Sequence, residues 1–518
     1  MKNSQIDTLA TLPELHARNH PDSTALIYND TFISYRELDR RSNQVANAFD
    51  SDGLARQNNI AFLDKNSDNF FYLLFGAAKA GVCMVTVNFR LTASEVSYIV
   101  EDSESEYLFV GPDFVDVALA CQASTPRLKK VIVVGGEGDN SLEHWLAGQP
   151  DTPPTRRAPT ATERAVQMYT SGTTGHPKGV MLSHRCMIVA AVEGLSMWPV
   201  MHEPGASVLC TMPLFHIAGA NLSLACLYAG GQVVIMRETL PAEVVRQLVE
   251  RKIRVVPLPP ALIHEIVRLP DIHSHDLSYL DTLLISGSAI TVELLREAQG
   301  VLKCGFALSY GMTECCGGVT YLGPRDCVPN AGKLLASAGK PFGSSAIRIV
   351  DPDRKDLPAG EIGEIACLSD RVMTGYWNRP EATAEAIEGD WYYSGDAGYM
   401  DERGYLYVVD RIKDMVISGG ENIYPVEIEN ELIKHPAVAD VAIIGIPDEK
   451  WGESLLASVI LEPGASVSGK ELESYLRNTL AGYKVPRRYV FVDTFPRNAT
   501  GKVLKREMRA QWKAAGGK

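Results

Sequence analysis

The sequence has no run rich in lysine or arginine and no apolar stretch that approaches the ~18 residues of a membrane-spanning helix. The 50 Lys and Arg residues are outnumbered by 63 Asp and Glu residues, which gives a formal net charge of −13. This charge argues against a nucleic-acid partner. The first residues lack the apolar core of a signal peptide, and the last three match no common targeting signal. We therefore expect a cytoplasmic protein without an integral membrane segment.

Ten cysteines are scattered along the chain without a single Cys-x-x-Cys pair. We expect most of them to be small buried side chains in a reducing compartment. Cys315 and Cys316 are adjacent, which is too constrained for an ordinary disulfide. Packing in the core and lining of a pocket are both open interpretations for this pair.

At 518 residues the chain is too long for one hydrophobic core, so we expect two or more domains. The first two-thirds alternate segments of helical periodicity, such as residues 38–49, with short apolar runs. These runs predict buried strands at residues 131–134, 233–236, 255–258 and 282–285. Strands that alternate with helices predict parallel or mixed α/β sheets.

The pattern changes near residue 346, where a smaller β-rich unit begins. Its predicted strands are residues 347–350, 364–368 and 405–409. The main domain boundary is expected at residues 411–413, and a compact α+β domain of about a hundred residues follows it. The elements predicted for this domain are helices at residues 426–434 and 472–479 and strands near residues 441–444 and 456–461.

Residues 169–180 are the most informative stretch of the chain. Gly172 and Gly175 let backbone N–H groups come close to an anion. Further donors are the hydroxyl and ammonium groups of Ser171, Thr173, Thr174 and Lys178. A strand is expected before the loop, and Ser183 is a candidate N-cap for a helix after it. The spacing is not that of a Walker A motif. Two interpretations of these residues remain: a phosphate-binding loop of another kind, or a flexible surface turn.

Four further segments follow in order, at residues 309–314, 393–396, 410–414 and 496–502. They read Ser-Tyr-Gly-Met-Thr-Glu, Tyr-Ser-Gly-Asp, Asp-Arg-Ile-Lys-Asp and Pro-Arg-Asn-Ala-Thr-Gly-Lys. Together with the Ser/Thr/Gly loop they resemble the core motifs of the adenylate-forming (AMP-binding) superfamily, in its acyl- and aryl-CoA synthetase branch. The resemblance covers nearly the whole chain, from residue 34 to residue 502.

The resemblance implies an α/β fold in two parts. A large N-terminal domain of several subdomains would contain two α/β sheets plus a small β unit, and a small mobile α+β C-terminal domain would follow. We place the AMP-binding N-terminal domain at residues 1–411 and the mobile C-terminal domain at residues 412–518.

The resemblance also implies an AMP-forming acid–thiol ligase that uses ATP, Mg²⁺ and coenzyme A. Such a site must hold ATP, present a carboxylate in line with the α-phosphate, and neutralise the charge that develops. Glu314 is the predicted Mg²⁺ ligand and a catalytic residue. The residues expected to contact the nucleotide are Thr170, Ser171, Gly172, Thr173, Thr174, Gly175, Lys178, Gly287, Ser288, Ala289, Ser309, Tyr310, Gly311, Thr313, Asp396 and Arg411.

Several of these residues receive individual roles from the resemblance. Thr313 would hydrogen-bond the α-phosphate, and Tyr310 would stack on the adenine. Asp396 would bind the ribose hydroxyl groups, assisted by Arg411. Residues 287–289 would form a wall of the adenine pocket.

The C-terminal domain is expected to serve both half-reactions. Lys502 is the predicted adenylation lysine, whose ammonium group would bridge the attacking carboxylate and the α-phosphate. Lys505 is the alternative, but no glycine precedes it. Lys413 resembles the hinge residue of the family. Two consecutive glycines, Gly419 and Gly420, suit a tunnel for the pantetheine arm of coenzyme A, or else a simple β-turn.

His216 resembles the aromatic gate between the acid and thiol tunnels, where it would also help to deprotonate the thiol. A buried structural histidine is the other interpretation. The acid pocket is expected from residues 216–221, 286–289 and 307–319. The small or apolar side chains that these segments supply are Ile217, Ala218, Gly219, Ala220, Ala289, Ala307, Gly317, Gly318 and Val319, and Asn221 is a polar residue among them. We therefore predict a hydrophobic acid: a medium- or long-chain fatty acid, or an aryl or alicyclic one.

Free coenzyme A is the expected acceptor, because the sequence ends shortly after Lys502 and contains no carrier domain. The pantetheine arm of a separate carrier protein is the alternative acceptor. A nucleotide-binding protein without catalysis is a third hypothesis, and the intact Lys178, Glu314 and Lys502 argue against it. Homodimers are common in the family, and the sequence leaves the oligomeric state open.

Overall fold

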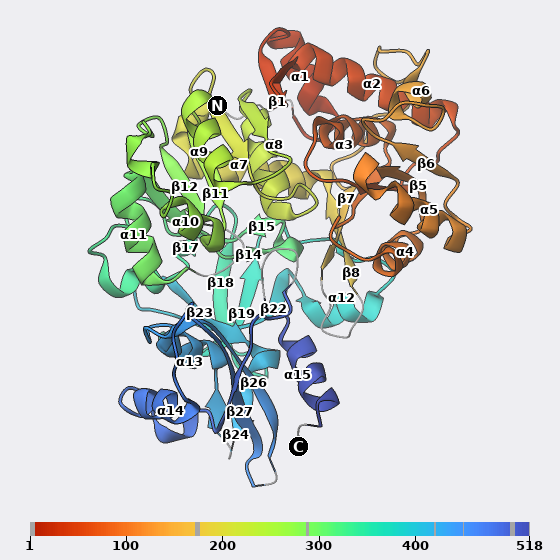
Figure 1. Cartoon of the computed structure of the whole chain (residues 1–518). Helices are drawn as coiled ribbons and strands as arrows, with labels where there is room; N and C mark the ends of the chain where they lie inside the picture. The colour runs from red at the N-terminus through yellow and green to blue at the C-terminus, as the bar shows by residue number, and fades with distance from the viewer. Residues whose placement is uncertain are drawn as a thin grey trace. The chain divides into compact units, whose positions relative to one another are not determined.

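A computed structural model of the protein describes residues 6–170, 177–285, 290–418, 421–448, 450–497 and 503–516. The chain forms two compact units (Figure 1). Unit 1 contains Met1–Leu335, Gly339–Ala346 and Cys367–Tyr392. Unit 2 contains Ala336–Ala338, Ile347–Ala366 and Tyr393–Lys518. The domain boundary that the sequence places at residues 411/412 stays a prediction.

A seven-stranded sheet in the order β13-β12-β11-β9-β10-β1-β2 forms one layer of unit 1. Its strands are parallel except for β2, which pairs antiparallel with β1. The strands are β1 (Thr24–Tyr28), β2 (Thr31–Ser34), β9 (Ser207–Cys210), β10 (Gln232–Ile235), β11 (Val255–Leu258), β12 (Thr282–Ile285) and β13 (Gly305–Leu308). The helices that alternate with β9 to β13 are α8 (Ile217–Tyr228), α9 (Pro241–Glu250), α10 (Pro260–Ile266) and α11 (Val292–Leu302).

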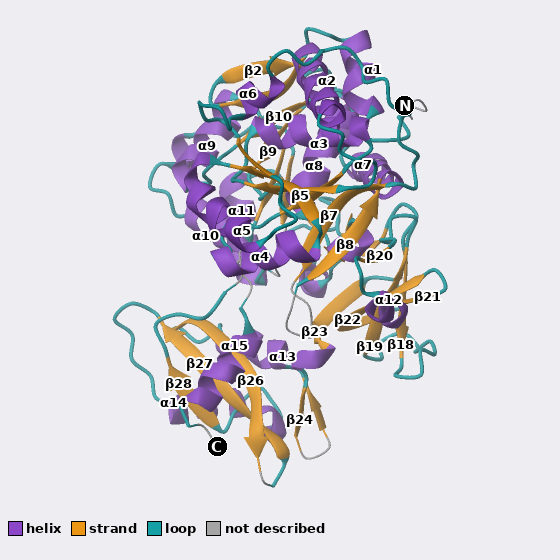
Figure 2. Ribbon diagram, turned by 90° about the vertical axis from the view of Figure 1, so that its right-hand side faces the viewer, coloured by secondary structure: helices purple, strands orange, loops and turns teal. Residues whose placement is uncertain are grey.

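A second seven-stranded sheet follows the order β20-β8-β7-β4-β3-β5-β6. Its strands are β3 (Asn59–Leu63), β4 (Cys83–Thr86), β5 (Ser105–Val110), β6 (Lys130–Val133), β7 (Arg164–Thr170), β8 (Lys178–Ser183) and β20 (Gly375–Tyr376). The helices of this part of the chain are α1 (Thr11–Asn19), α2 (Tyr35–Ser51), α3 (Asp68–Ala80), α4 (Ala93–Asp102), α5 (Val115–Ser124), α6 (Leu142–Leu146), α7 (His184–Met197) and α12 (Pro380–Ala386). In Figure 2 the strands of unit 1 run between groups of helices.

The sequence pattern explains why these strands form. Every residue of β3 and of β4 is buried, as expected for parallel strands that are covered on both faces. Helix α2 begins where the Ser34 hydroxyl accepts a hydrogen bond from the backbone N–H of Glu37. The predicted α/β architecture with two sheets is confirmed, and so are the four predicted buried strands and the helix at residues 38–49.

Strands β18 (Ala346–Val350), β19 (Gly363–Leu368), β22 (Trp391–Met400) and β23 (Leu406–Arg411) form the predicted small β-rich part. The short strand β21 (Ile387–Glu388) pairs with the start of β22. Strands β22 and β23 pair antiparallel, with Asp396 opposite Arg411. Asp396 of the 393–396 motif and Arg411 of the 410–414 motif therefore lie on neighbouring strands.

The C-terminal part of unit 2 is built on the sheet β25-β24-β27-β26, with β28 beside β27. Its strands are β24 (Val416–Ser418), β25 (Glu421–Ile423), β26 (Val438–Asp448), β27 (Gly452–Leu461) and β28 (Arg488–Phe491). Because side chains alternate along a strand, the two faces of β26 have different partners. Ile443 packs with the helices α13 (Pro425–Leu432) and α14 (Gly469–Arg477), whereas Ile444 packs with α15 (Lys505–Ala514). The predicted α+β C-terminal part is confirmed.

All ten cysteines are free, and nine of them are buried. The interpretation of most cysteines as small buried side chains is therefore confirmed. Cys315 and Cys316 are both fully buried. Among the described residues, the helices are too short or too polar to cross a membrane.

Candidate active site

The Ser/Thr/Gly loop connects two strands of the second sheet. Strands β7 and β8 pair antiparallel, and Thr170 opposite Lys178 is the pair from which the loop leaves. After β8, the Ser183 hydroxyl accepts a hydrogen bond from the backbone N–H of Cys186 and caps helix α7, as the sequence predicts. The predicted phosphate ligands Ser171, Gly172, Thr173, Thr174 and Gly175 lie outside the described residues.

Glu314 lies at the tip of a short hairpin. Strand β14 (Gly311–Met312) leads into a 3-10 turn (Thr313–Cys315), and β15 (Gly317–Gly318) returns antiparallel to β14. The carboxylate of Glu314 is buried, and its Oε1 accepts hydrogen bonds from the Thr170 hydroxyl at 3.3 Å and the Tyr376 hydroxyl at 3.0 Å. The structure thus brings together two predicted site residues, Thr170 and Glu314, from segments 144 positions apart.

Tyr376 is a site residue that the sequence reasoning missed. It lies on β20, opposite Val180 of β8. Burial, followed by the charge of Glu314, raises the pKa of its hydroxyl group, which therefore remains a proton donor. The ammonium group of Lys178 is 4.9 Å from the centre of the Tyr376 ring, within the range of a cation–π contact. One tyrosine thus contacts both a predicted phosphate-binding lysine and the predicted metal ligand.

The remaining residues of the 309–314 motif shape the same hairpin. The hydroxyl group of Ser309 donates to the carbonyl of Thr320 at 2.8 Å, and the Tyr310 carbonyl accepts from the Val319 N–H at 2.8 Å. A Cβ atom on Gly311 would lie 2.1 Å from the Gly317 carbonyl oxygen, so only glycine fits there. Thr313 is buried beside Glu314. Their contacts with phosphate and adenine stay predictions, and Gly287, Ser288 and Ala289 lie outside the described residues.

His216 is the N-cap residue of α8, where its Nδ1 accepts a hydrogen bond of 3.3 Å from the backbone N–H of Ala218. Burial lowers the pKa of the ring, which favours the neutral form. One turn further along α8, the amide nitrogen of Asn221 donates to the carbonyl of Cys316 at 2.6 Å. Two of the three segments predicted to form the acid pocket are therefore in contact.

Unit 2 contains the predicted ribose-binding pair. Nε of Arg411 is 2.5 Å from Oδ1 of Asp396, and the Asp396 side chain is almost fully buried. The backbone N–H of Asp396 donates to the hydroxyl group of Ser394. This ion pair fixes the direction of a carboxylate, as recognition of two hydroxyl groups requires.

The other predicted residues of unit 2 are placed only in part. Lys413 lies in the short turn Ile412–Asp414 directly after β23, and its pKa is lowered by burial and then by Arg411. Gly419, Gly420 and Lys502 lie outside the described residues. Lys505, the alternative adenylation lysine, begins α15 and its ammonium group is 2.8 Å from Oε1 of Glu429. Lys505 therefore has a structural partner in the C-terminal part.

Comparison with known proteins gives consistent matches along the chain. The AMP-binding enzyme family model matches residues 13–377, and the model of the AMP-binding enzyme C-terminal domain matches residues 427–502. The fatty acid–acyl-carrier-protein ligase ScoC of Streptomyces coeruleorubidus is 38% identical over 513 residues, which cover 98% of this chain and 97% of the relative. A feruloyl-CoA synthase of an Amycolatopsis species is 37% identical over 507 residues, covering 97% of this chain and 99% of the relative.

A solved structure with the same architecture is that of the anthranilate CoA ligase AuaEII in complex with anthranoyl-AMP. It superposes with a TM-score of 0.90 at 27% sequence identity, and the match covers 100% of both chains.

Proposed function

The chain belongs to the AMP-binding enzyme family, and from this membership we propose that it is an ATP-dependent acyl-CoA ligase of the AMP-forming type. In the first half-reaction, a carboxylate oxygen attacks the α-phosphorus of ATP, the bond to the β-phosphate breaks, and pyrophosphate leaves. In the second, the sulfur of coenzyme A attacks the acyl carbon, a thioester forms, and AMP leaves. The observation that carries the proposal is the buried Glu314 carboxylate, held by Thr170 at the strand end from which the Ser/Thr/Gly loop leaves.

The residues present fit a magnesium ion with its nucleotide. Mg²⁺ prefers one or two carboxylates together with phosphate oxygens, and Glu314 would supply the carboxylate. When bound, the ion neutralises phosphate charge. The hydroxyl groups of Thr170 and Tyr376 orient Glu314, and Lys178 places a positive charge at the start of β8.

Residues of unit 2 complete the proposed first half-reaction. Asp396 binds the ribose hydroxyl groups while Arg411 fixes its carboxylate. Lys502 supplies the ammonium group that binds the attacking carboxylate and the α-phosphate together, which offsets the negative charge of both. The pairing of Lys505 with Glu429 supports Lys502 as the lysine available for this role.

In the second half-reaction, the proposed hinge at Lys413 rotates the C-terminal domain and brings the Gly419–Gly420 segment to the thiol. His216 accepts the thiol proton at Nδ1, its unprotonated nitrogen, in exchange for the hydrogen bond from the Ala218 N–H, because a ring with a lowered pKa is neutral at physiological pH. The small domain thus serves both proposed half-reactions.

The acid is proposed to be hydrophobic, either a medium- or long-chain fatty acid or an aryl or alicyclic acid. The segments assigned to its pocket offer small and apolar side chains such as Ile217, Ala218 and Val319, and the amide nitrogen of Asn221, a polar side chain among them, is bound to the Cys316 carbonyl. The relatives are consistent with this range, since their names include a fatty acid ligase and a feruloyl-CoA synthase.

The second candidate function is an adenylating enzyme that loads the pantetheine arm of a carrier protein. The observation that favours it is the similarity to an acyl-carrier-protein ligase along 98% of this chain. The two functions share the first half-reaction and differ only in the thiol acceptor.

The deciding experiment measures pyrophosphate release from ATP and Mg²⁺ with a panel of acids, each with and without coenzyme A. The panel contains fatty acids of increasing length, cinnamates, benzoates, cyclic acids and amino acids. Sustained release that depends on coenzyme A with one acid class establishes the ligase. Release that stops near one equivalent of enzyme, and resumes with a carrier protein, establishes the second candidate. No release with any acid contradicts both.

We also propose a cytoplasmic location, because ATP and coenzyme A are cytoplasmic substrates. A homodimer is the oligomeric state proposed from the family resemblance. Light scattering during size-exclusion chromatography tests it: a mass of one chain, 56.6 kDa, contradicts the dimer.

A further inference from the structure

Arg371 is a buried arginine that connects several segments of unit 1. The proposed reaction gives this arginine no role. The side chain of Arg371 is only 2% exposed. Its Nη1 donates to the Gly318 carbonyl at 2.7 Å, and its Nη2 donates to the Ser345 hydroxyl at 2.8 Å. Its Nε is 2.7 Å from Oε2 of Glu193, an ion pair that lacks the geometry of a hydrogen bond, and the guanidinium group lies over the Phe342 ring.

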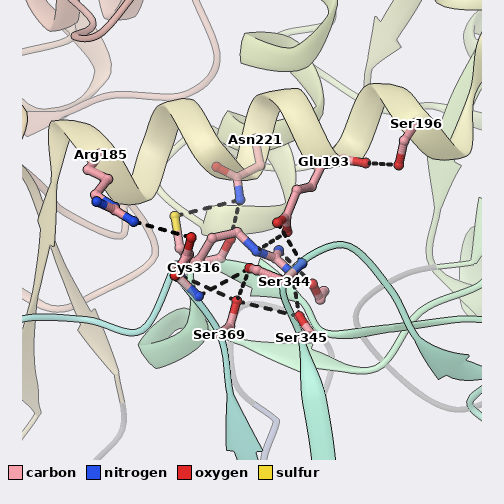
Figure 3. Close-up of polar contacts among 11 residues, drawn as sticks. Arg185, Glu193, Ser196, Asn221, Cys316, Ser344, Ser345 and Ser369 are labelled. Carbon is pink, nitrogen blue, oxygen red and sulfur yellow. Dashed lines mark hydrogen bonds and ion pairs between the residues drawn. The ribbon is translucent and has the colours of Figure 1, made fainter. Parts of the chain in front are cut away.

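Glu193 comes from helix α7 and is held on its other side as well. Its Oε1 accepts a hydrogen bond of 2.7 Å from the backbone N–H of Ser344. A Cβ atom on Gly343 would lie 2.3 Å from the Glu193 carboxyl carbon, so the backbone there is close to the carboxylate because it carries no side chain. Figure 3 shows Glu193 pointing from α7 toward Ser344 and Ser345.

These contacts hold the segment from Glu314 to Gly318, which comprises the turn of the hairpin and its returning strand β15. Three alternate carbonyl groups of this segment accept hydrogen bonds from other parts of unit 1. The donors are Met373 N–H to Glu314, Asn221 Nδ2 to Cys316, and Arg371 Nη1 to Gly318, at 2.7, 2.6 and 2.7 Å. Because both Met373 and Arg371 belong to the loop after β19, this loop fixes the segment 314–318 at its two ends.

The segment 314–318 needs such support because its own backbone is not extended throughout. Cys316 has a φ of 51° and Gly317 a φ of 108°, both in the left-handed region. A Cβ atom on Gly318 would lie 2.2 Å from the Ser309 hydroxyl oxygen. Residues 317–318 therefore present backbone rather than side chains, and the width of a pocket beside them depends on where this backbone is held.

We propose that Arg371 and Glu193 are positioning residues that set the acid specificity of the enzyme. This inference rests on the proposed function, since residues 307–319 are a wall of the proposed acid pocket. The Arg371–Glu193 clamp joins α7 to the Gly317–Gly318 backbone and holds the wall at one distance. Arginine suits this task because its planar fork contacts a carboxylate, a carbonyl and a hydroxyl group at once, which a lysine cannot do.

The chain offers a matched control on the same two elements. Arg185 of α7 pairs with Asp370, the residue before Arg371, at 3.2 Å. Both side chains of this second pair are more than half exposed, at 56% and 57%. Removal of this pair takes away an ion pair between the same helix and the same loop. It leaves the carbonyl of Gly318 with its donor, Arg371.

Two variants test the clamp without leaving a lone buried charge. Arg371→Lys keeps a cation opposite Glu193 but loses the fork. The double variant Glu193→Leu with Arg371→Met replaces the ion pair by apolar side chains of similar volume, a change that folded proteins often tolerate. In both, we expect the KM for the preferred acid to rise about tenfold or more, while the KM for ATP changes less than about twofold.

We also expect the clamp variants to lose selectivity. The ratio of kcat/KM between the preferred acid and an acid longer by two carbons should fall about tenfold or more. The control variant Arg185→Ala with Asp370→Asn should keep the values of the parent. The proposal is overturned if both clamp variants keep the acid KM and selectivity of the parent, or if the control variant shifts them equally.

Hydrogen–deuterium exchange separates a failure of the clamp from a failure of the proposed function. The backbone amides of residues 316–320 should exchange faster in both clamp variants than in the parent and the control. If the parent enzyme releases no pyrophosphate with any acid, the proposed function fails, and exchange alone decides on the clamp. Unchanged exchange in these amides overturns it.

Discussion

The hydroxyl group of Tyr376 donates a hydrogen bond of 3.0 Å to Oε1 of Glu314. Tyr376 reaches this position because β20 pairs with β8, the strand that begins at Lys178. The sheet that carries the Ser/Thr/Gly loop therefore also fixes the carboxylate that is proposed to bind Mg²⁺. Hydrogen bonds to a charged acceptor contribute about 1.5–3 kcal/mol each, which is enough to matter for the orientation of a ligand.

Replacement of Tyr376 by phenylalanine should weaken the binding of Mg²⁺ at Glu314 without unfolding the protein. The variant keeps the ring beneath Lys178 but removes the donor to Glu314. We expect the Mg²⁺ concentration for half-maximal adenylation to rise, and kcat to fall about tenfold. Tyr321→Phe is the control, since the Tyr321 hydroxyl donates to the Met197 carbonyl. An unchanged Mg²⁺ dependence of pyrophosphate release would contradict the role of Tyr376.

Replacement of Lys502 and replacement of Lys505 should cause different defects, one in catalysis and one in stability. Lys502→Ala should abolish adenylate formation, while thioester formation from pre-made acyl-AMP largely survives. Lys505→Ala should lower the melting temperature instead, because it leaves the Glu429 carboxylate without its ion-pair partner in a partly buried position. Each half-reaction is measured by itself, with pyrophosphate release and with thioester formation. Equal loss of both half-reactions in the Lys502 variant would contradict a small domain that acts in two arrangements.

Local patterns predicted much of the fold from the sequence. The four buried strands and helix α2 follow from apolar runs and helical periodicity, and the cap of α7 follows from Ser183. Strand β8 was not predicted, because Lys178 and Gly179 at its start are more typical of a loop. It forms because β7 and β20 supply hydrogen-bond partners on both sides.

The candidate site was predictable where a motif carries it, as for Glu314, Asp396 and Arg411. Tyr376 was missed because its role depends on a contact between residues 62 positions apart. Glu193 and Arg371 were missed for the same reason, since nothing in the spacing of a helix residue and a distant loop residue indicates that they pair. Side chains that position others are recognised only once the backbone has brought them together.

The Asp396–Arg411 pair should govern the affinity for ATP. Arg411→Lys keeps a positive charge but loses the Nε contact that fixes the Asp396 carboxylate at 2.5 Å. We expect the KM for ATP to rise about tenfold, with a smaller change in the KM for the acid. Arg403→Ala is the matched control, because Arg403 pairs with Asp401 in the exposed turn between the same two strands. A similar increase in the control would show that general disturbance of these strands, rather than the pair, is responsible.

The buried His184 should make the stability of the protein depend on pH below neutrality. Its side chain is fully buried and its Nδ1 accepts a hydrogen bond from the backbone N–H of Leu9. Burial lowers the pKa of the ring to about 4, from a usual value of 6.5. Between these two values the unfolded chain binds more protons than the folded one, so this histidine favours the folded state fully above pH 6.5 and progressively less as the pH falls toward 4.

The shift in the pKa of His184 corresponds to a loss of about 3 kcal/mol over this pH range. The variant His184→Asn retains an acceptor for Leu9 but has no group that titrates. We therefore expect its melting temperature to fall less steeply than that of the parent between pH 6.5 and pH 4. Thermal unfolding of both proteins at several pH values measures the difference, to which other buried histidines such as His16 contribute equally in both. Parallel profiles would show that His184 is not protonated on unfolding in this range, and that its low pKa is not what makes the fold sensitive to acid.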